Sequence, residues 1–340
     1  MSKFPAVNYI GNKRKINDWI VDLIPNDVIT ILDAFAGGNS VSYKLKSKGY
    51  NVITNDILYS SYIISKALVE NQTTRLTREK LLLLKSKTNS VNINLLNQLS
   101  FLKNKLYFDY EVYELHLLLQ LTFKLKSYEK YLFVSLLRRA MIRKLPYSRM
   151  NIEWDQIVKL RDENYSYQKY GRKRAYHNLP FFDHILSDLD SYNGAIFDSK
   201  TICKSYNKDI LSLLKSIQEP IDLIYFDPPY PGTMNDYHSF YGDIDHIFKK
   251  NKLNFINLHE TDSFLSNFNK ILSLAVKKSK YIMLSTNNNT RPTPLELRNL
   301  LEKFGKVKTL EKLHNYQLTG KSNKKSNTEI ILLLELKKEN

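Results

Sequence analysis

Four consecutive residues, Asp227-Pro228-Pro229-Tyr230, carry the sharpest chemical signal in this chain of 340 residues. They follow residues 222–226, in which the apolar stretch Leu-Ile-Tyr-Phe after Asp222 is typical of a buried strand. The two prolines fix two φ angles and remove two N–H donors. The Asp227 carboxylate and the Pro228 carbonyl oxygen can therefore each accept a bond from a planar amine, while Tyr230 stacks on the attached ring. An amine held in this way is aligned to attack a methyl group on a sulfonium, a step that depends mainly on positioning and electrostatics.

A glycine turn early in the chain is the second candidate site. Glycine lets the backbone approach a ligand closely, and asparagine tolerates a positive φ. Asp56 ends the next predicted strand, where a carboxylate can accept bonds from both hydroxyls of a ribose. The chain has neither a GxGxxG nor a GxxxxGKS/T motif, so an adenosine cofactor without a pyrophosphate fits best. The turn consists of Asp33, Ala34, Phe35, Ala36, Gly37, Gly38 and Asn39.

Short apolar runs with sparse glycine and proline predict the elements that position these residues. The strand–turn–helix–strand order near the N-terminus is the βαβ unit of a parallel sheet. Strands are expected over 29–32, 51–54, 222–226 and 281–285, and a terminal antiparallel hairpin over 307–314 and 329–336. Helices are expected over 41–48, 255–278 and 294–304.

The middle of the chain has a different character. Residues 60–145 contain no glycine or proline and are rich in Leu and Lys, which predicts helices. Residues 146–200 are polar and rich in Tyr and Arg, which predicts loops and short elements. The sequence thus predicts a catalytic domain formed by 1–56 and 201–340, with an inserted, mainly helical domain at 57–200.

Composition limits the class of protein. Hydrophobic residues make up 43% and charged residues 25%, as in folded soluble proteins. No apolar run approaches the roughly 18 residues of a membrane span, the N-terminus lacks the apolar core of a signal peptide, and Cys203 is the single cysteine, so we expect a cytoplasmic protein without a membrane partner. The seven histidines show no metal-ligand spacing. A formal charge of +17 favours a polyanionic partner, although a Lys-rich proteome would also produce it.

Taken in order along the chain, these motifs resemble the Dam-like, alpha-group family of adenine-specific DNA methyltransferases. The resemblance covers nearly the whole chain apart from most of 57–200. It begins at Tyr9-Ile-Gly-Asn-Lys13, runs through Phe35 to Asn39, Asp56 and Asp209 to Asp227–Tyr230, and ends in the hairpin that contains Thr328-Glu329-Ile-Ile. One departure is Asn39, which replaces the second glycine of the family's FxGxG signature.

The resemblance implies S-adenosylmethionine as methyl donor and a flipped-out adenine in double-stranded DNA as acceptor. It also implies catalytic roles for Asp227, Pro228, Pro229 and Tyr230. It implies that Lys13 lies near the methionine carboxylate of the cofactor and Asp209 near its adenine. The full cofactor set that it implies is Tyr9, Lys13, Asp33, Phe35, Gly37, Asn39, Asp56 and Asp209.

DNA contacts are expected mainly in the insertion, where basic residues cluster. Arginine can pair with guanine in the major groove, or it can hold phosphates without reading sequence. A basic loop in the terminal hairpin is a further candidate for phosphate contact. The predicted DNA-binding residues are Arg138, Arg139, Arg143, Lys144, Arg149, Arg172, Lys173, Arg174, Lys321 and Lys324.

We therefore predict a Rossmann-like S-adenosylmethionine-dependent methyltransferase sheet with an inserted helical DNA-recognition domain. The predicted function is site-specific adenine-N6 methylation, in the modification arm of a restriction–modification system whose endonuclease is a functional partner. Two alternatives stay open at this point. One is N-methylation of RNA or protein, since related motifs serve both; the other is a catalytically silent DNA-binding module.

Overall fold

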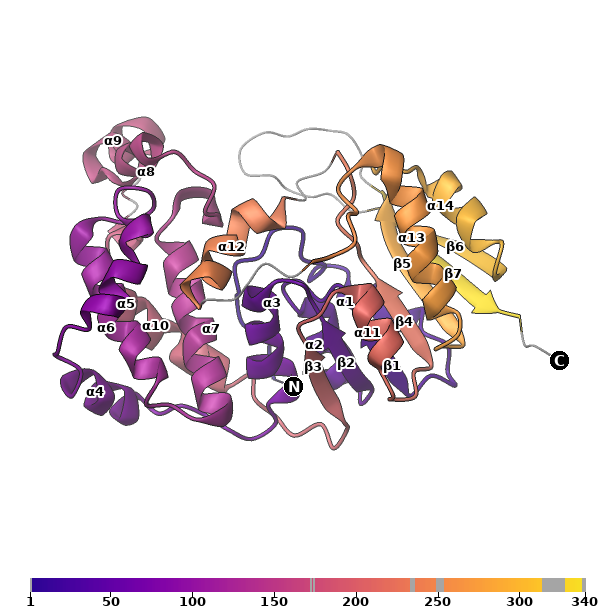
Figure 1. Ribbon diagram of the computed structural model, residues 1–340, viewed down its shortest axis with the longest axis horizontal. Helices are drawn as coiled ribbons and strands as arrows, with labels where there is room; N and C mark the ends of the chain where they lie inside the picture. Colours follow the sequence, from indigo (N-terminus) through magenta and orange to yellow (C-terminus); the bar gives the residue numbers. More distant parts are fainter. Residues whose placement is uncertain are drawn as a thin grey trace. The chain divides into compact units, whose positions relative to one another are not determined.

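The computed structural model describes residues 2–171, 173, 175–232, 236–248, 254–313 and 328–337 (Figure 1). The chain divides into two compact units. The sheet unit comprises Lys13–Ile57, Lys200–Asp236 and Leu253–Asn340, and the helical unit comprises Met1–Asn12, Leu58–Ser199 and Tyr237–Lys252. No helix in the described part of the chain combines the length and apolarity that crossing a membrane requires.

Seven strands among the described residues form one sheet in the order β3-β2-β1-β4-β5-β7-β6. β1 to β5 run parallel, and β7 lies antiparallel between β5 and β6. This arrangement confirms the predicted Rossmann-like fold and its terminal hairpin. The strands are β1 (Thr30–Asp33), β2 (Asn51–Asn55), β3 (Cys203–Tyr206), β4 (Leu223–Phe226), β5 (Tyr281–Asn287), β6 (Gly305–Leu313) and β7 (Thr328–Leu336).

The central strands are short and almost wholly buried, as expected for parallel strands covered on both faces. On β4, Ile224 and Phe226 join a core cluster that includes Phe264 and Phe268 of α13 and Leu297 of α14. The helices of the sheet unit are α1 (Asn17–Asp22), α2 (Ser40–Ser47), α11 (Ile210–Ser216), α13 (Thr261–Ala275) and α14 (Pro294–Leu301).

The helical unit is built around α7, whose residues from Leu132 to Ile142 are all buried. α7 packs against α10 and α3 (Figure 1). Its α-helices are α3 (Tyr59–Ile64), α4 (Arg78–Ser86), α5 (Ile93–Gln98), α6 (Asp109–Thr122), α7 (Ser127–Arg143), α8 (Trp154–Arg161), α9 (Glu163–Tyr170), α10 (Phe181–Asn193) and α12 (Tyr237–Ile247). A π-helix, η1 (Ser65–Glu70), and the 3-10 turns η2 (Ser100–Leu102), η3 (Pro146–Ser148) and η4 (Ala175–His177) complete it.

Three expectations need correction. Residues 146–200 are largely helical, because Asp162 caps the N-terminus of α9 and Gly171 ends that helix at φ 65°, while α10 buries an apolar face. The helix expected over 255–278 is shorter, since α13 begins at Thr261. Of the residues that the prediction places in the catalytic domain, 2–12 and 237–248 group with the compact helical unit.

Candidate active site

Three carboxylates follow the carboxyl ends of adjacent strands in the sheet unit. Asp33 ends β1, Asp56 follows β2 and Asp227 follows β4. β1 lies between β2 and β4, and the chain returns to β4 only after β3 is placed on the far side of β2. Ligands in open α/β sheets bind at such a switch in strand order, outside the carboxyl ends. The sheet therefore gathers the residues that the sequence singled out on one edge.

Asp227 belongs to a three-member charge cluster. The Lys13 ammonium lies 3.4 Å from Oδ1 of Asp227 and 3.2 Å from Oε2 of Glu329. The Lys13 and Glu329 side chains are 9% and 1% exposed, whereas that of Asp227 is 24% exposed. Burial raises the pKa of Asp227 to about 6; Lys13 opposes this rise and Glu329 adds to it. We call this set the Lys13 cluster.

Glu329 was not among the predicted site residues, although the hairpin that contains it was. A signal was present in the sequence: Glu329 opens the apolar run of β7, and a buried Glu is rare unless it is paired. What the sequence did not show is the partner, because Lys13 lies at the other end of the chain.

The residues after Asp227 form the expected rigid arm, but Tyr230 is more enclosed than predicted. Its side chain is 5% exposed, its ring stacks on Phe264 with centroids 5.4 Å apart, and its hydroxyl donates to the Ser285 carbonyl oxygen at 2.8 Å. Pro228 is buried as well. In this structure Tyr230 is a packing residue that supports the arm, so stacking on a ligand ring would have to use the face opposite Phe264.

The glycine turn has the predicted backbone geometry. Gly37 and Asn39 both adopt positive φ, 49° and 62°, and the Gly37 N–H donates to Oδ2 of Asp56 at 2.7 Å. Asn39 is fully buried and its amide group donates to the Gly37 carbonyl oxygen, which holds the turn closed. The Asp56 carboxylate and the backbone of the turn are thus already adjacent.

Asp33 is almost completely buried beneath this turn and accepts a hydrogen bond from the Ser42 hydroxyl. Burial raises its pKa to about 7, against the Ser42 hydrogen bond and with reinforcement from the Asp227 and Asp56 charges. Phe35 is partly buried, with its ring centroid 6.1 Å from that of Phe226. The Asp56 carboxylate, the Phe35 ring and the glycine turn together suit an adenosine group with a ribose diol.

Asp209 caps α11, and its oxygens accept bonds from the Ser212 N–H at 3.1 Å and the Ile256 N–H at 3.0 Å. Its neighbour Asn207, which was not predicted, donates to the carbonyl oxygens of Asp56 and Ile57. Asp209 therefore fixes the segment that carries Asn207, which in turn holds the backbone of Asp56. A role for Asp209 toward a cofactor would come in addition to this capping role.

Tyr9 belongs to the helical unit, whereas the other predicted cofactor residues belong to the sheet unit. Its ring stacks with those of Tyr237 and Tyr241, with centroids 5.4 and 5.0 Å apart. The Arg138 guanidinium lies 5.0 Å from the Tyr241 ring and donates to the Val7 carbonyl oxygen at 2.7 Å. The N-terminal segment is thus held by α7 and α12.

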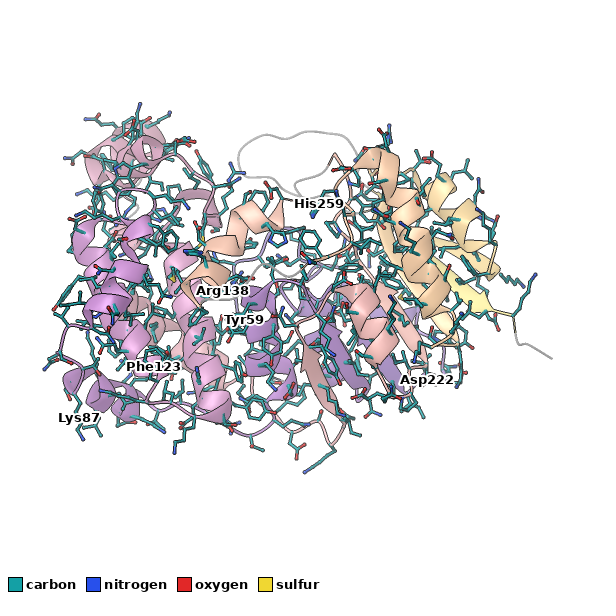
Figure 2. The ribbon with its side chains drawn as sticks, viewed as in Figure 1. Tyr59, Lys87, Phe123, Arg138, Asp222 and His259 are labelled. Atoms are coloured by element: carbon teal, nitrogen blue, oxygen red, sulfur yellow. The ribbon has the colours of Figure 1, made fainter. Side chains whose placement is uncertain are left out.

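Three of the predicted DNA-binding residues are interior residues of the helical unit. Arg138, labelled in Figure 2, is 1% exposed. Arg139 is 8% exposed and pairs with both carboxylate oxygens of Asp188, at 2.6 and 3.1 Å. Lys144 is 1% exposed. Their assignment to DNA is corrected, because side chains buried to this degree cannot reach phosphates or base edges in this conformation.

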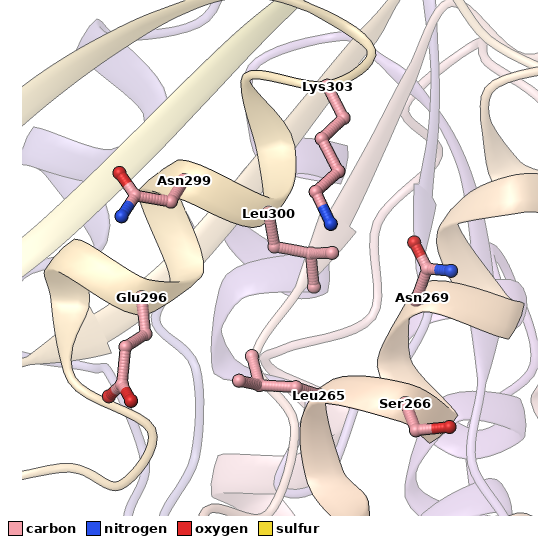
Figure 3. Close-up of a pocket in the computed structure, with 7 residues that line it drawn as sticks. All are labelled: Leu265, Ser266, Asn269, Glu296, Asn299, Leu300 and Lys303. Carbon is pink, nitrogen blue, oxygen red and sulfur yellow. The ribbon is translucent and has the colours of Figure 1, made fainter.

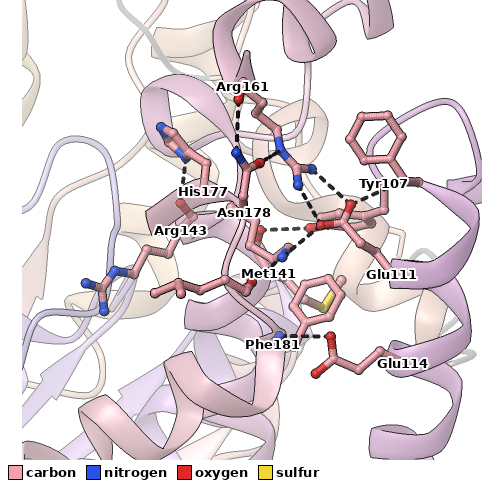
Figure 4. Close-up of polar contacts among 12 residues, drawn as sticks. Tyr107, Glu111, Glu114, Met141, Arg143, Arg161, His177, Asn178 and Phe181 are labelled. Carbon is pink, nitrogen blue, oxygen red and sulfur yellow. Dashed lines mark hydrogen bonds and ion pairs between the residues drawn. The ribbon is translucent and has the colours of Figure 1, made fainter. Parts of the chain in front are cut away.

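Lys144 belongs to a second charge cluster, centred on Glu111 of α6 (Figure 4). Both Glu111 oxygens accept bonds from Arg161, at 2.9 and 2.6 Å, and Lys144 lies 2.7 Å from Oε1. Burial alone would raise the pKa of Glu111, but Arg161 and Lys144 together hold it below its usual value. Arg161 also donates to Asn178 at 3.1 Å. This Glu111 cluster fastens α8 and the segment before α10 to α6 and α7.

The remaining predicted DNA-binding residues differ in how exposed their side chains are. Arg143 is 30% exposed and lies 3.3 Å from Asp188, Arg149 is half-buried beside Tyr147 and Phe240, and Lys173 is exposed. Lys173 follows α9, whose Tyr167 is 58% exposed. Arg172, Arg174, Lys321 and Lys324 lie outside the described residues.

A surface pocket of about 410 Å³ lies between α13 and α14 of the sheet unit (Figure 3). Its walls mix apolar and polar side chains, and none of the predicted cofactor or catalytic residues lines it. We therefore do not assign the site to it. Its lining residues are Leu265, Ser266, Asn269, Glu296, Asn299, Leu300 and Lys303.

Known proteins match this chain over most of its length. The model of the D12 class N6 adenine-specific DNA methyltransferases matches residues 9–300. The chain is 42% identical over 337 residues to the Type II methyltransferase M2.HphI of Haemophilus parahaemolyticus, covering 98% of both chains. It is 27% identical over 261 residues to the Type II methyltransferase M.FokI of Planomicrobium okeanokoites, covering 68% of this chain and 36% of that one. It is 24% identical over 378 residues to the modification methylase StsI of Streptococcus sanguinis, covering 97% and 52%.

Proposed function

The chain belongs to the D12 class N6 adenine-specific DNA methyltransferase family, and we propose that its methyl donor is S-adenosylmethionine and that its acceptor is an adenine flipped out of the duplex. The observation that carries this proposal is the position of Asp227. It is a partly exposed carboxylate at the end of β4, on the same sheet edge as the glycine turn and Asp56.

The residues present fit the proposed cofactor. The Asp56 carboxylate would accept the ribose hydroxyls, and the turn at Gly37 and Asn39 would present its backbone to the nucleoside. Phe35 would contact the adenine ring from the edge, and Asp33 would support the turn from beneath. When bound, the cofactor supplies an electrophilic methyl group on a sulfonium.

The protein's contribution to transfer would be to hold and align the amine. Asp227 and the Pro228 carbonyl oxygen accept the two N6–H bonds, which draws the nitrogen lone pair out of the ring system toward the methyl group. With the cofactor bound, transfer would join N6 to the methyl carbon as the carbon–sulfur bond breaks. The product amine then carries an extra proton, and Asp227, with a pKa of about 6, can take it and release it to water.

We also propose that the helical unit reads the target DNA and that the chain modifies DNA within a restriction–modification system. The exposed Lys173 beside α9, the half-exposed Arg143 and Arg149, and the sequence neighbours Arg172 and Arg174 are the candidate contacts there. Lys321 and Lys324 are candidates for phosphate contact. The names of the relatives support the modification role, and a cognate endonuclease would be a functional partner that need not bind the protein.

Methylation of mixed plasmid DNA with labelled S-adenosylmethionine tests the proposal. We expect label in DNA, and single-molecule sequencing should place N6-methyladenine within one short motif. A parallel reaction with RNA and with the flow-through proteins of the purification serves as control. Label in RNA or protein but not in DNA would overturn the acceptor, and no binding of S-adenosylmethionine by calorimetry would overturn the donor.

A further inference from the structure

We propose that Glu329 is a positioning residue for methyl transfer: it shares the Lys13 ammonium with Asp227 and thereby keeps acceptor capacity of Asp227 available to the target amine. This inference rests on the proposed role of Asp227 and extends it to a residue on β7, a strand that the transfer chemistry does not otherwise require.

One cation contacts both carboxylates. The Lys13 ammonium lies 3.2 Å from Oε2 of Glu329 and 3.4 Å from Oδ1 of Asp227. Glu329 is fully buried, so its charge stays fixed in place rather than sampling solvent. β7 holds it rigidly, since Glu329 is paired in register with Asn287 of β5 and Lys312 of β6.

The sharing matters because an ammonium and an amine compete for the same oxygens. A carboxylate has about four acceptor positions, and a tight ion pair with Lys13 would occupy the ones nearest the cation. Glu329, the second anion, keeps Lys13 from forming a tighter ion pair with Asp227. Lys13 then opposes the rise that burial causes in the pKa of Asp227, without taking the place of the substrate.

Removing either partner should move the titration of Asp227 in opposite directions. Loss of the Lys13 charge leaves a buried carboxylate beside an anion, so the pKa of Asp227 rises further. Loss of the Glu329 charge removes a like charge and leaves the cation to Asp227, so its pKa falls. The other titratable groups that interact with Asp227 are Asp33 of β1, Tyr225 of β4 and Tyr230, and both substitutions leave them in place.

The test compares Glu329→Gln, which keeps the shape and an acceptor oxygen, with Lys13→Gln. We measure kcat and kcat/KM for DNA methylation between pH 5 and 9. For E329Q we expect kcat to fall about 10- to 100-fold, as misplacement of a reacting group does, with the acidic limb of the profile moved to lower pH. For K13Q the limb should move to higher pH. Profiles that superimpose on the wild type would overturn the proposal and leave Glu329 a purely structural partner.

A double-substituted chain separates coupling between the two residues from a general loss of folding, because only coupled residues give non-additive effects. If Glu329 acts through Lys13, adding E329Q to K13Q should lower kcat by less than twofold. A further tenfold fall would show that Glu329 acts independently and would overturn the proposal. The wild-type reaction separates this result from the proposed function: without wild-type methylation the function fails, whereas an active wild type with unshifted variants sinks only the role of Glu329.

Discussion

The two buried charge clusters of this protein have opposite arrangements of charge. In the helical unit one carboxylate, Glu111, lies between two cations, and its side chain and those of Arg161 and Lys144 are 1–2% exposed. In the sheet unit one cation, Lys13, lies between two carboxylates, and Asp227 keeps 24% of its side chain exposed. The first cluster is closed to solvent, and the second is open on one side.

This difference indicates that buried ion pairing stabilises the fold in the helical unit and supports chemistry in the sheet unit. Arg161 and Lys144 together hold the pKa of Glu111 below its usual value, although burial acts to raise it. One cation shared by two anions does not offset burial at Asp227, whose pKa rises to about 6. The closed cluster is built to stay ionised, whereas the open one can exchange a proton and accept a new donor.

The largest effect that this comparison predicts is on stability, from Glu111→Gln. The substitution leaves Arg161 and Lys144 as uncompensated buried cations, which costs about 3–5 kcal/mol. The two tryptophans allow each unit to be followed separately, since Trp154 lies in the helical unit and Trp19 in the sheet unit. In a Trp19→Phe background, the urea transition seen by Trp154 should move to lower concentration.

A matched control replaces the whole cluster with apolar residues, as Glu111→Leu with Arg161→Met and Lys144→Met. Exchange of a complete buried cluster is often neutral or stabilising, so this variant should recover most of the loss. If Glu111→Gln costs less than about 1 kcal/mol, the range of an exposed ion pair, the contrast between the two clusters does not hold.

The second effect falls on catalysis. Asp227→Ala removes the acceptor that aligns the amine, so kcat should fall by at least about 10²–10³-fold, as with loss of one preorganised polar group. The unfolding transition of the sheet unit should not move to lower urea, since a carboxylate with a raised pKa is not a stabilising group. Methylation kinetics and urea unfolding with Trp19 as the reporter measure both. Activity within tenfold of the wild type would remove Asp227 from the mechanism.

Acidification should affect the two units in opposite directions. Asp33 and Asp227 have raised pKa values of about 7 and 6, so the folded sheet unit binds protons more readily than the unfolded chain, and its stability rises as pH falls from 7.5 to 5.5. In the helical unit, burial and the charges of Arg143 and Lys144 lower the pKa of His184 to about 4. The unfolded chain then binds the proton more readily, and stability falls as pH drops below about 6.5.

A pKa change of one contributes at most about 1.4 kcal/mol to the free energy of unfolding. The urea midpoints of the sheet unit and the helical unit should therefore move measurably apart as the pH falls. Trp154→Phe and Trp19→Phe backgrounds report the sheet and helical units in turn. Asp33→Asn should reduce the response of the sheet unit, to which Asp227 still contributes, and leave that of the helical unit unchanged. Transitions that move together would contradict the assignment of opposite proton linkage to the two units.

Local patterns predicted most of the sheet because its central strands are short, apolar and bounded by turn residues. They predicted the placement of Gly37, Asn39, Asp56 and Asp227 as well, since the ends of parallel strands meet at one edge. β3 was not predicted, because Cys203–Tyr206 is a short edge strand with mixed burial and no clear period. α10 was missed because a polar, Tyr-rich composition concealed its apolar face.

The charge clusters could not be predicted, because their partners are remote in sequence. The basic run at 138–144 indicates a surface helix if only composition is considered, yet α7 is surrounded by other helices and its cations turn toward Val7, Asp188 and Glu111. Lys13 and Glu329 meet only because β7 inserts beside β5. Whether a charged residue is exposed depends on partners that are distant in the sequence, and a local sequence pattern does not show those partners.

The smallest predicted effect is on DNA affinity, and it distinguishes exposed cations that bind DNA from interior cations that do not. Lys173 is exposed beside α9, so Lys173→Ala should weaken DNA binding a few-fold and lower the slope of log K against log salt by about 0.9, as expected for one lost phosphate contact. Fluorescence anisotropy with a labelled duplex at several salt concentrations measures both. Arg139→Gln is the interior control: it breaks the pair with Asp188 and should destabilise the helical unit while leaving the salt slope of the folded fraction unchanged. A lower slope for Arg139→Gln, or an unchanged slope for Lys173→Ala, would contradict the assignment of phosphate contacts to exposed rather than interior cations.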